Sequence, residues 1–552
     1  MESLISRKLR GGFYTPKPIA DFLTKWVIKN NSDDILEPSC GDGVFIESVI
    51  RRLLSMGASE DSIRKQLHAV EYDSIEAEKA LRHFSIYGIK PSTDQVFNGD
   101  FFQYSKSNLT DKRQFDCVLG NPPFIRYQDF PEEQRQPAFA LMIRAGLKPN
   151  RLTNSWIPFL VSSTLLLKND GRIGMVIPAE LFQVNYAAET RKFLSKVYST
   201  LFIITFRKLV FKDVQQEIIL LLGEKNGKKN HGIRIVEIDD IRDLVGLDLG
   251  QLKQSTTKIE QSSEKWTQYY LSDNEIAVVK RIRSDTSIPL SGEFMDVDVG
   301  VVTGQNRFFV ITNEIMDKYK LERFTKRVIG KANQIKGIIA TVDSWSQLAS
   351  SNNAVFLLDI PDVPLESLPD GVQRYIQYGI SEGFEKGYKC RIRKKWWRVP
   401  SIWIPDAFML RQVHMYPRVV ANECNATVTD TLHRVRLLNG MTKNSLSCAF
   451  LNSLTLAFSE ITGRSYGGGV LTFEPSEAER LPLPIRNAKL VDFEEIDKLV
   501  RNNRIEDVLD ITDNLLLNKG LDLSQKEITI LRGIWRKLRD RRVERRSILI
   551  QK

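Results

Sequence analysis

The chain has 552 residues, a formal net charge of +11 at pH 7 and five cysteines. This length suffices for more than one domain, and the basic excess favours a polyanionic partner such as DNA. No apolar run is long enough for a membrane span or a signal peptide, and the cysteines show neither a CxxC pair nor a metal-ligand spacing. We therefore expect a cytoplasmic protein with reduced thiols and no bound metal.

The first predicted element is an amphipathic helix that begins at Pro16. Thr15 is a good N-cap for this helix, and proline is a good first helical residue. The apolar residues that follow share one helical face, and they are Ile19, Phe22, Leu23, Trp26 and Val27.

A strand, a glycine turn and a helix are predicted next, over residues 34–37, 38–43 and from 44 onward. Gly41 and Gly43 let the backbone approach a ligand closely, whereas the carboxylates of Glu37 and Asp42 would repel a phosphate. The spacing is not GxGxxG, and the chain contains no GxxxxGK motif followed by Ser or Thr. The turn therefore favours a cationic cofactor over a nucleotide.

Two further strand ends carry acidic residues. A strand over residues 67–71 ends in Glu71, at about the distance from the glycine turn where βαβ folds bind a ribose, and Asp73 then starts a helix. A third strand over residues 95–97 leads to Asp100 and Phe101, which offer an acceptor for an exocyclic amine and an aromatic wall for a purine. These ends predict a ligand site at the carboxyl edge of a parallel sheet.

A fourth strand, over residues 115–120, runs directly into Asn121-Pro122-Pro123-Phe124. The prolines end the strand and hold the asparagine amide at the sheet edge, beside an aromatic ring. An isolated Asn-Pro pair indicates only a turn. After three strand ends with suitable groups, it predicts a pocket for a flat molecule that carries an amine.

These residues resemble the class I S-adenosylmethionine-dependent methyltransferases, and Asn-Pro-Pro-Phe resembles the tetrapeptide of the N6-adenine DNA enzymes. The order of motifs, with residues 12–16 first and a long C-terminal region last, is similar to the gamma class of type II modification enzymes, the TaqI-methylase-like arrangement. The resemblance implies S-adenosylmethionine as the cofactor. The residues that it implies for cofactor binding are Tyr14, Thr15, Pro16, Glu37, Pro38, Ser39, Cys40, Gly41, Gly43, Glu71, Asp100, Phe101 and Asn121.

The resemblance also implies the fold. A fifth strand is expected within residues 165–178, a sixth over 201–206 and a seventh over 217–222. We expect an α/β, Rossmann-like class I methyltransferase domain with a mostly parallel seven-stranded sheet and a reversed last strand. A mixed α+β target-recognition domain is expected to follow it.

The implied chemistry depends on positioning. By family analogy, the Asn121 side-chain oxygen and the Pro122 carbonyl accept both N6 hydrogens of a flipped adenine, and Pro123 completes the turn. Phe124 stacks on the base and favours its developing positive charge. Phe211 matches the family position of a second stacking ring, although core packing under a hairpin explains it equally well.

Changes in composition divide the chain into four segments. Residues 1–245 form the predicted catalytic domain and 246–290 a linker or insert. Residues 291–490 form the predicted DNA-recognition domain, and 491–552 a basic helical segment. Within the third segment, residues 296–310 alternate and turn like a β-hairpin.

Two distal segments are candidate DNA contacts. Residues 389–398 are basic and contain tryptophans, and residues 462–470 form a glycine-rich loop. A solvated face and a plain turn are the alternatives. The candidate DNA-binding residues are Arg391, Arg393, Lys394, Lys395, Trp396, Arg464, Tyr466 and Gly468.

The last predicted element is a helix with an apolar stripe and many arginines on its other faces. It either packs on the recognition domain and grips phosphates or is a plain terminal helix. The stripe consists of Leu531, Ile534, Trp535 and Leu538.

The sequence thus predicts a bacterial or archaeal methyltransferase that modifies adenine N6 at a short site in double-stranded DNA. We expect it to act as a monomer on DNA, in a restriction-modification system beside a separate restriction endonuclease. An RNA N6-adenine methyltransferase and a component of a larger restriction or phage-defence complex are the alternatives. Protein-glutamine methyltransferases share the tetrapeptide, but they lack a large basic C-terminal domain.

Overall fold

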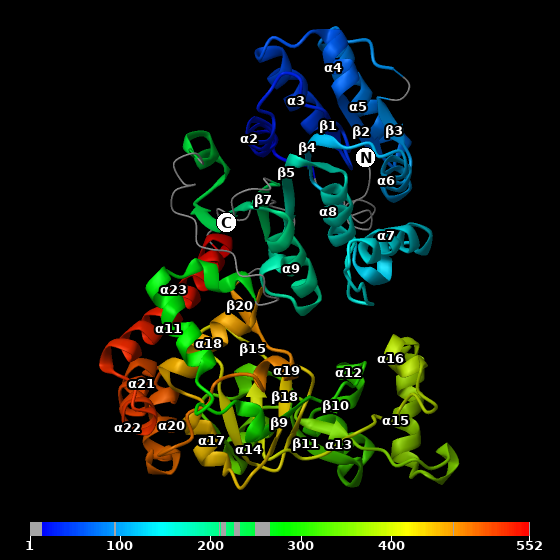
Figure 1. Cartoon of the computed structure of the whole chain (residues 1–552). Coiled ribbons are helices and arrows are strands. Elements are labelled where there is room, and N and C mark those ends of the chain that lie inside the picture. Colours follow the sequence, from blue (N-terminus) through cyan, green and yellow to red (C-terminus); the bar gives the residue numbers. More distant parts are fainter. Residues whose placement is uncertain are drawn as a thin grey trace. The chain divides into compact units, whose positions relative to one another are not determined.

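The computed structural model of the chain describes residues 14–92, 95–208, 210, 217–225, 232–248, 265–466 and 469–550. It forms two compact units, Met1–Asp273 with Glu544–Lys552 and Asn274–Val543 (Figure 1). Residues 491–543 belong to the second unit. No helix among the described residues combines the length and apolarity needed to cross a membrane.

The first unit is built on an eight-stranded sheet with the order β3-β2-β1-β4-β5-β7-β6-β8. Strands β1 to β5 pair in parallel, and β7 runs antiparallel to both β5 and β6. The strands are β1 Ile35–Glu37, β2 Leu67–Glu71, β3 Val96–Asn98, β4 Phe115–Gly120, β5 Leu167–Pro178, β6 Thr200–Phe206, β7 Ile218–Glu224 and β8 Gly232–Ile238.

This sheet confirms the predicted fold class and adds one strand to it. The reversed strand is β7, as expected, but β8 follows it and pairs in parallel with β6 along residues 200–206. The sequence analysis did not foresee β8. Its pairing satisfies main-chain groups that β6 would otherwise expose at the edge of the sheet.

Helices cover both faces of this sheet (Figure 1). Alternate residues of β6 face opposite sides, so that Leu201 and Ile203 join one hydrophobic cluster while Phe202 and Ile204 join the other. The first cluster contains residues of α6 Phe101–Thr110, α7 Glu132–Arg144, α8 Trp156–Leu165 and α9 Ala188–Val197. The second contains residues of α2 Lys17–Val27, α3 Val44–Ser55, α4 Glu60–Gln66 and α5 Ser74–Ile86.

The second unit is mixed α+β, as predicted, and contains three sheets among its described residues. Their orders are β12-β16-β14-β18-β9, β10-β13-β11-β17 and β15-β20-β19. The strands are β9 Met295–Val299, β10 Val310–Ile311, β11 Thr325–Ile329, β12 Ile339–Thr341, β13 Phe356–Leu358, β14 Ala407–Leu410, β15 Gln412–Val413, β16 Val419–Glu423, β17 Thr427–Val428, β18 Leu432–Leu437, β19 Arg464–Tyr466 and β20 Val470–Thr472.

Helices surround these sheets and form most of the C-terminal part of the chain. They are α11 Asp273–Ser284, α12 Asn306–Phe309, α13 Asn313–Tyr319, α14 Val342–Ser350, α15 Asp370–Ser381, α16 Tyr388–Arg391, α17 Lys443–Ala449, α18 Ser453–Thr462, α19 Pro475–Ala478, α20 Phe493–Arg501, α21 Ile505–Thr512, α22 Lys519–Leu521 and α23 Gln525–Ile550.

The predicted hairpin over residues 296–310 is wrong. Strand β9 pairs with β18, and β10 pairs with β13 in another sheet. Between them, Gly304 adopts a left-handed φ of +82° and the short helix α12 begins at Asn306. The alternating pattern therefore correctly indicated two strands, β9 and β10, but each of them pairs with a strand that is distant in sequence.

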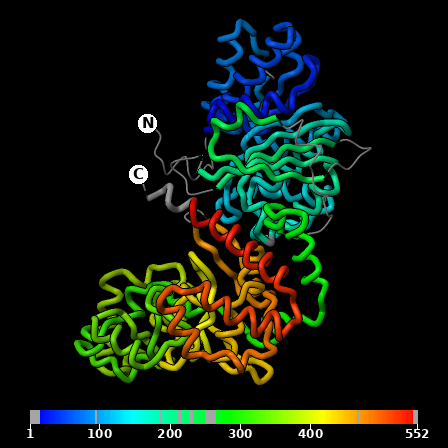
Figure 2. The backbone as a smooth tube through the Cα atoms, turned by 90° about the vertical axis from the view of Figure 1, so that its left-hand side faces the viewer, coloured from blue at the N-terminus to red at the C-terminus, as the bar shows by residue number. Residues whose placement is uncertain are grey.

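The C-terminal helix α23 packs on the second unit beside its orange-coloured helices (Figure 2). Its arginines face acidic residues, because Arg532 pairs with Asp513 at 2.8 Å and Arg542 pairs with Glu460 at 2.6 Å. The Arg542 and Glu460 side chains are only 2% and 3% exposed. The predicted stripe is buried, and its residues are Leu531, Ile534, Trp535 and Leu538.

Candidate active site

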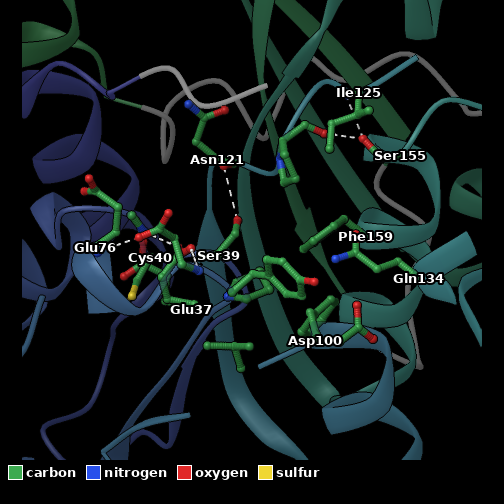
Figure 3. Close-up of a pocket in the computed structure, with 18 of the residues that line it drawn as sticks. Glu37, Ser39, Cys40, Glu76, Asp100, Asn121, Ile125, Gln134, Ser155 and Phe159 are labelled. Atoms are coloured by element: carbon green, nitrogen blue, oxygen red, sulfur yellow. Dashed lines mark hydrogen bonds between the residues drawn. The ribbon is translucent and has the colours of Figure 1, made fainter. Parts of the chain in front are cut away.

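A pocket of about 560 Å³ lies at the carboxyl edge of the first sheet, where β1, β2 and β4 end (Figure 3). It brings together twelve of the residues predicted from the sequence. They are Tyr14, Thr15, Glu37, Pro38, Ser39, Cys40, Gly41, Glu71, Asp100, Phe101, Asn121 and Pro123.

The glycine turn after β1 uses its two glycines differently. Gly41 has a φ of +52°, lines the pocket and has open space where a Cβ would lie. Gly43 has a φ of +91° and lies outside the lining, and a Cβ there would come within 2.9 Å of the Ala80 Cα. Gly41 thus leaves room for a ligand, whereas Gly43 permits α3 to pack against α5.

Carboxylates form one wall of the pocket. Glu37 is 1% exposed, and neither of its carboxylate oxygens has a hydrogen-bond partner among the described residues. Burial raises the pKa of Glu37 well above its usual range, and the nearby charges of Glu71 and Asp42 raise it further. The Glu37 carboxyl has no basic partner in the described part of the chain, as expected for a site that receives a cation.

Glu71 is held in place by the backbone of the two turns beside it. It accepts hydrogen bonds from the main-chain N–H groups of Gly41 and Asp73, each at 2.8 Å. Burial nevertheless raises its pKa. Asp73 caps α5, as the sequence predicted.

The third strand end supplies both a helix cap and an aromatic wall. Asp100 caps α6 by accepting a hydrogen bond from the Gln103 N–H at 2.8 Å, and burial raises its pKa. Phe101 is 3% exposed and stacks on Phe159, with ring centroids 5.0 Å apart. The rings of Phe101 and Phe159 therefore form a joint apolar wall.

Asn121 forms hydrogen bonds with two other pocket residues, one through its side chain and one through its main chain. Its Nδ2 donates to the Thr15 hydroxyl at 3.1 Å, and the Ser39 hydroxyl donates to the Asn121 main-chain oxygen at 3.2 Å. The first bond directs the amide nitrogen toward Thr15. Within the planar amide, the side-chain oxygen consequently points away from Thr15.

The expected role of Thr15 as a helix cap is wrong. Pro16 occupies the N-cap position of α2, and no side chain caps this helix. The Thr15 hydroxyl contacts Asn121 instead, over a sequence distance that no local pattern reveals.

Four predicted residues lie outside the pocket lining, namely Pro16, Gly43, Pro122 and Phe124. Pro122 is buried. The Phe124 ring is partly buried and packs against both hydrophobic clusters of the first unit. Phe211 lies outside the described residues.

The sequence analysis missed the part of the pocket that follows the tetrapeptide. The apolar run that begins at Trp156 predicts a buried helix, but it gives no sign that the start of that helix faces a pocket. The residues missed in this part are Ile125, Asp129, Phe130, Pro131, Gln134, Ser155 and Phe159.

The basic run of the second unit is only partly available to DNA. Arg391 and Lys394 are exposed. In contrast, the Lys395 ammonium group lies 2.8 Å from a carboxylate oxygen of Asp362.

Two other residues of this run hold the second unit together. Arg393 donates to the Val302 carbonyl at 2.8 Å. Trp396 packs on Phe308, with ring centroids 4.7 Å apart. The Trp396 ring therefore packs within the second unit and does not serve as a stacking surface for DNA.

In the glycine-rich segment, Arg464 forms an ion pair with Glu477 at 3.0 Å. The side chain of Tyr466 and the whole of Gly468 lie outside the described part of the chain. Among the described residues, no group of three or more His, Cys, Asp or Glu side chains could hold a metal ion.

The two turn glycines provide a matched stability test. Gly43→Ala should lower the free energy of unfolding by about 2 kcal/mol or more, because a strained φ is combined with a steric clash. Gly41→Ala should cost only about 1 kcal/mol, because the strained φ acts alone. Urea unfolding of both variants measures the difference, and equal losses would contradict the separate roles.

Comparisons with known proteins find two matching family models. Residues 4–282 match the family model described as N-6 DNA Methylase, and residues 263–517 match the Type II methyltransferase M.Eco57I, C-terminal domain. Type II methyltransferase M.AccI of Acinetobacter calcoaceticus is 23% identical over 94% of this chain and 95% of its own length. Type II methyltransferase M.XamI of Xanthomonas campestris pv. amaranthicola is 22% identical over 86% of this chain and 85% of its own length.

A solved structure shares the fold over nearly the whole chain. The type IIL restriction-modification enzyme MmeI, in complex with DNA, is similar with a TM-score of 0.60 at 12% identity, over 95% of this chain and 75% of that chain. The chain therefore belongs to the N-6 DNA methylase family, whose members use S-adenosylmethionine to methylate adenine N6 in DNA.

Proposed function

We propose that this protein is the modification enzyme of a type II restriction-modification system and methylates one adenine within a short duplex sequence, in the cytoplasm. The observation that carries the proposal is the position of Asn121 at the edge of a pocket whose wall contains the buried, uncompensated carboxylate of Glu37. One site thus combines a place for a cation with an acceptor for an amine.

The acidic wall supports binding of the cofactor. Glu37 and Asp42 would face the ammonium and sulfonium charges, and Gly41 leaves space for the carbon chain between these groups. Glu71 would accept hydrogen bonds from the ribose hydroxyls. The aromatic wall of Phe101 and Phe159 suits the flat adenine of the cofactor. The bound cofactor supplies an electrophilic methyl group.

The tetrapeptide is proposed to hold the target amine. The Asn121 side-chain oxygen and the Pro122 carbonyl would accept its two hydrogens and concentrate the nitrogen lone pair toward the methyl group. Flipping the base out of the duplex costs a few kcal/mol. The solvent-accessible part of the Phe124 ring would offset part of this cost by stacking.

The second unit is proposed to bind the DNA. Arg391 and Lys394 are exposed, and we assign them contacts with phosphates. M.AccI, which matches this chain over nearly equal lengths, is named as a methyltransferase. This similarity supports a separate partner protein for DNA cleavage.

Removal of the Asn121 amide tests the proposed chemistry. Asn121→Ala should lower kcat by about 10² to 10³-fold, because the amine loses an acceptor made for the transition state. Transfer of labelled methyl groups to DNA, followed by mapping of the modified base, measures the effect. Asn108→Ala, near the C-terminal end of α6 and outside the pocket lining, is the control. Methylation of cytosine or RNA by the unaltered protein would refute the proposal.

The raised pKa of Glu37 predicts a pH-dependent affinity. The carboxylate takes up a proton at a higher pH than an ordinary glutamate, and the neutral form cannot attract a cation. The affinity for S-adenosylmethionine should therefore fall as the pH is lowered through this raised pKa.

Glu37→Gln should weaken S-adenosylmethionine binding about tenfold on the alkaline side of this titration and flatten its pH dependence. Calorimetric titration across pH measures both effects. Glu78→Gln, at an exposed position of α5, should leave them unchanged. An unaltered pH profile in Glu37→Gln would contradict the assignment.

The proposed phosphate contacts predict a salt effect. Replacing both Arg391 and Lys394 by alanine should weaken DNA binding on all sequences and reduce the slope of log K against log salt by about two. Fluorescence anisotropy at several salt concentrations measures this slope. Lys106→Ala removes one exposed charge on α6, in the first unit, and as the control it should leave the slope unchanged. A slope equal to that of the unaltered protein would exclude both contacts.

A further inference from the structure

The chain on both sides of Phe124 is fixed by one buried serine. Ser155 is 0% exposed and stands directly before α8. Its hydroxyl donates to the Pro123 carbonyl and accepts from the Ile125 N–H at 2.8 Å (Figure 3). Its own N–H donates to the Ile125 carbonyl at 3.0 Å. Three hydrogen bonds therefore determine the backbone path through the end of the tetrapeptide.

The preceding residue, Asn154, forms a further hydrogen bond to the segment that follows the tetrapeptide. The Asn154 side-chain oxygen accepts from the Tyr127 N–H at 3.1 Å. Its Nδ2 donates to the Tyr186 hydroxyl at 2.9 Å, and that hydroxyl donates to a carboxylate oxygen of Glu180. Asn154 thus joins the segment after the tetrapeptide to the loop that follows β5.

That loop is itself firmly anchored. The Arg191 guanidinium on α9 is 1% exposed and donates to the carbonyls of Leu181 at 2.9 Å and Val184 at 3.0 Å. Glu180 and Tyr186 flank these two carbonyls in the chain. The Tyr186 side chain that binds Asn154 therefore lies on a well-anchored loop.

We propose that Asn154 and Ser155 are positioning residues for methyl transfer. This inference rests on the proposed function. The reaction needs the Pro122 carbonyl and the Phe124 ring in fixed places, and both belong to the peptide segment that these residues hold. A displacement of about 1 Å in such a site can reduce the rate about 100-fold without loss of binding.

Helix α8 offers a matched control for the loss of a hydroxyl. Ser163 lies on the same helix and is also 0% exposed, but its hydroxyl has no hydrogen-bond partner among the described residues. Ser155→Ala and Ser163→Ala therefore remove the same atom at the same burial, and only the first removes contacts with the tetrapeptide.

The experiment compares the rates of single-turnover methylation by the variants. The substrate is a DNA duplex that contains the methylation site mapped beforehand with the unaltered protein. Ser155→Ala should slow the transfer step about tenfold to 100-fold, with the Kd values for S-adenosylmethionine and DNA changed by less than about twofold. Ser163→Ala should transfer at the unaltered rate. Ser155→Thr, which keeps the hydroxyl, should recover most of the lost rate.

A second pair of variants covers the case in which Ser155→Ala does not fold. Asn154→Asp keeps an acceptor for the Tyr127 N–H but loses the hydrogen bond to Tyr186, so it should retain only part of the transfer rate, whereas Asn154→Ala should lose more of it. Equal rates in Ser155→Ala and Ser163→Ala, or a loss confined to the Kd values, would overturn the positioning role. In that case, N6 methylation by the Ser163→Ala protein would still support the proposed function.

Discussion

The first unit keeps the Glu37 carboxylate away from water without giving it a hydrogen-bond donor among the described residues. Such burial costs several kcal/mol if the group stays ionised, and the neighbouring acids add repulsion. The packing of the surrounding strand ends, turns and helices stabilises the fold and offsets this cost. A cation would relieve this repulsion, whereas a phosphate would add to it.

Much of this arrangement could be predicted from the sequence because it is local. Strands β1, β2 and β4 are short apolar runs that end at a turn residue, and parallel pairing brings their ends to one edge. The cap at Asp73 depends only on the residues that follow it. Turn chemistry and apolar periodicity therefore located the strand ends, and the family resemblance added further residues, so that twelve of the predicted residues line the pocket.

The errors arose where a side chain or strand found its partner far along the chain. Thr15 contacts Asn121, which lies 106 positions away, and β9 pairs with β18 rather than with its neighbour. The charge of Lys395 and the aromatic ring of Trp396 suggested contacts with nucleic acid. The sequence did not reveal that Lys395 pairs with Asp362 and that Trp396 packs on Phe308. Ser155 could not be recognised, because a serine before an apolar helix is an ordinary feature.

The pair formed by Arg542 and Glu460 bears on how the protein is made. These side chains are separated by 82 residues, and the guanidinium also donates to the His414 carbonyl at 2.8 Å. Before Arg542 leaves the ribosome, burial of Glu460 would leave either an uncompensated charge or a protonated carboxyl without its ionic partner. The second unit thus cannot finish folding during translation until this late part of the polypeptide has emerged.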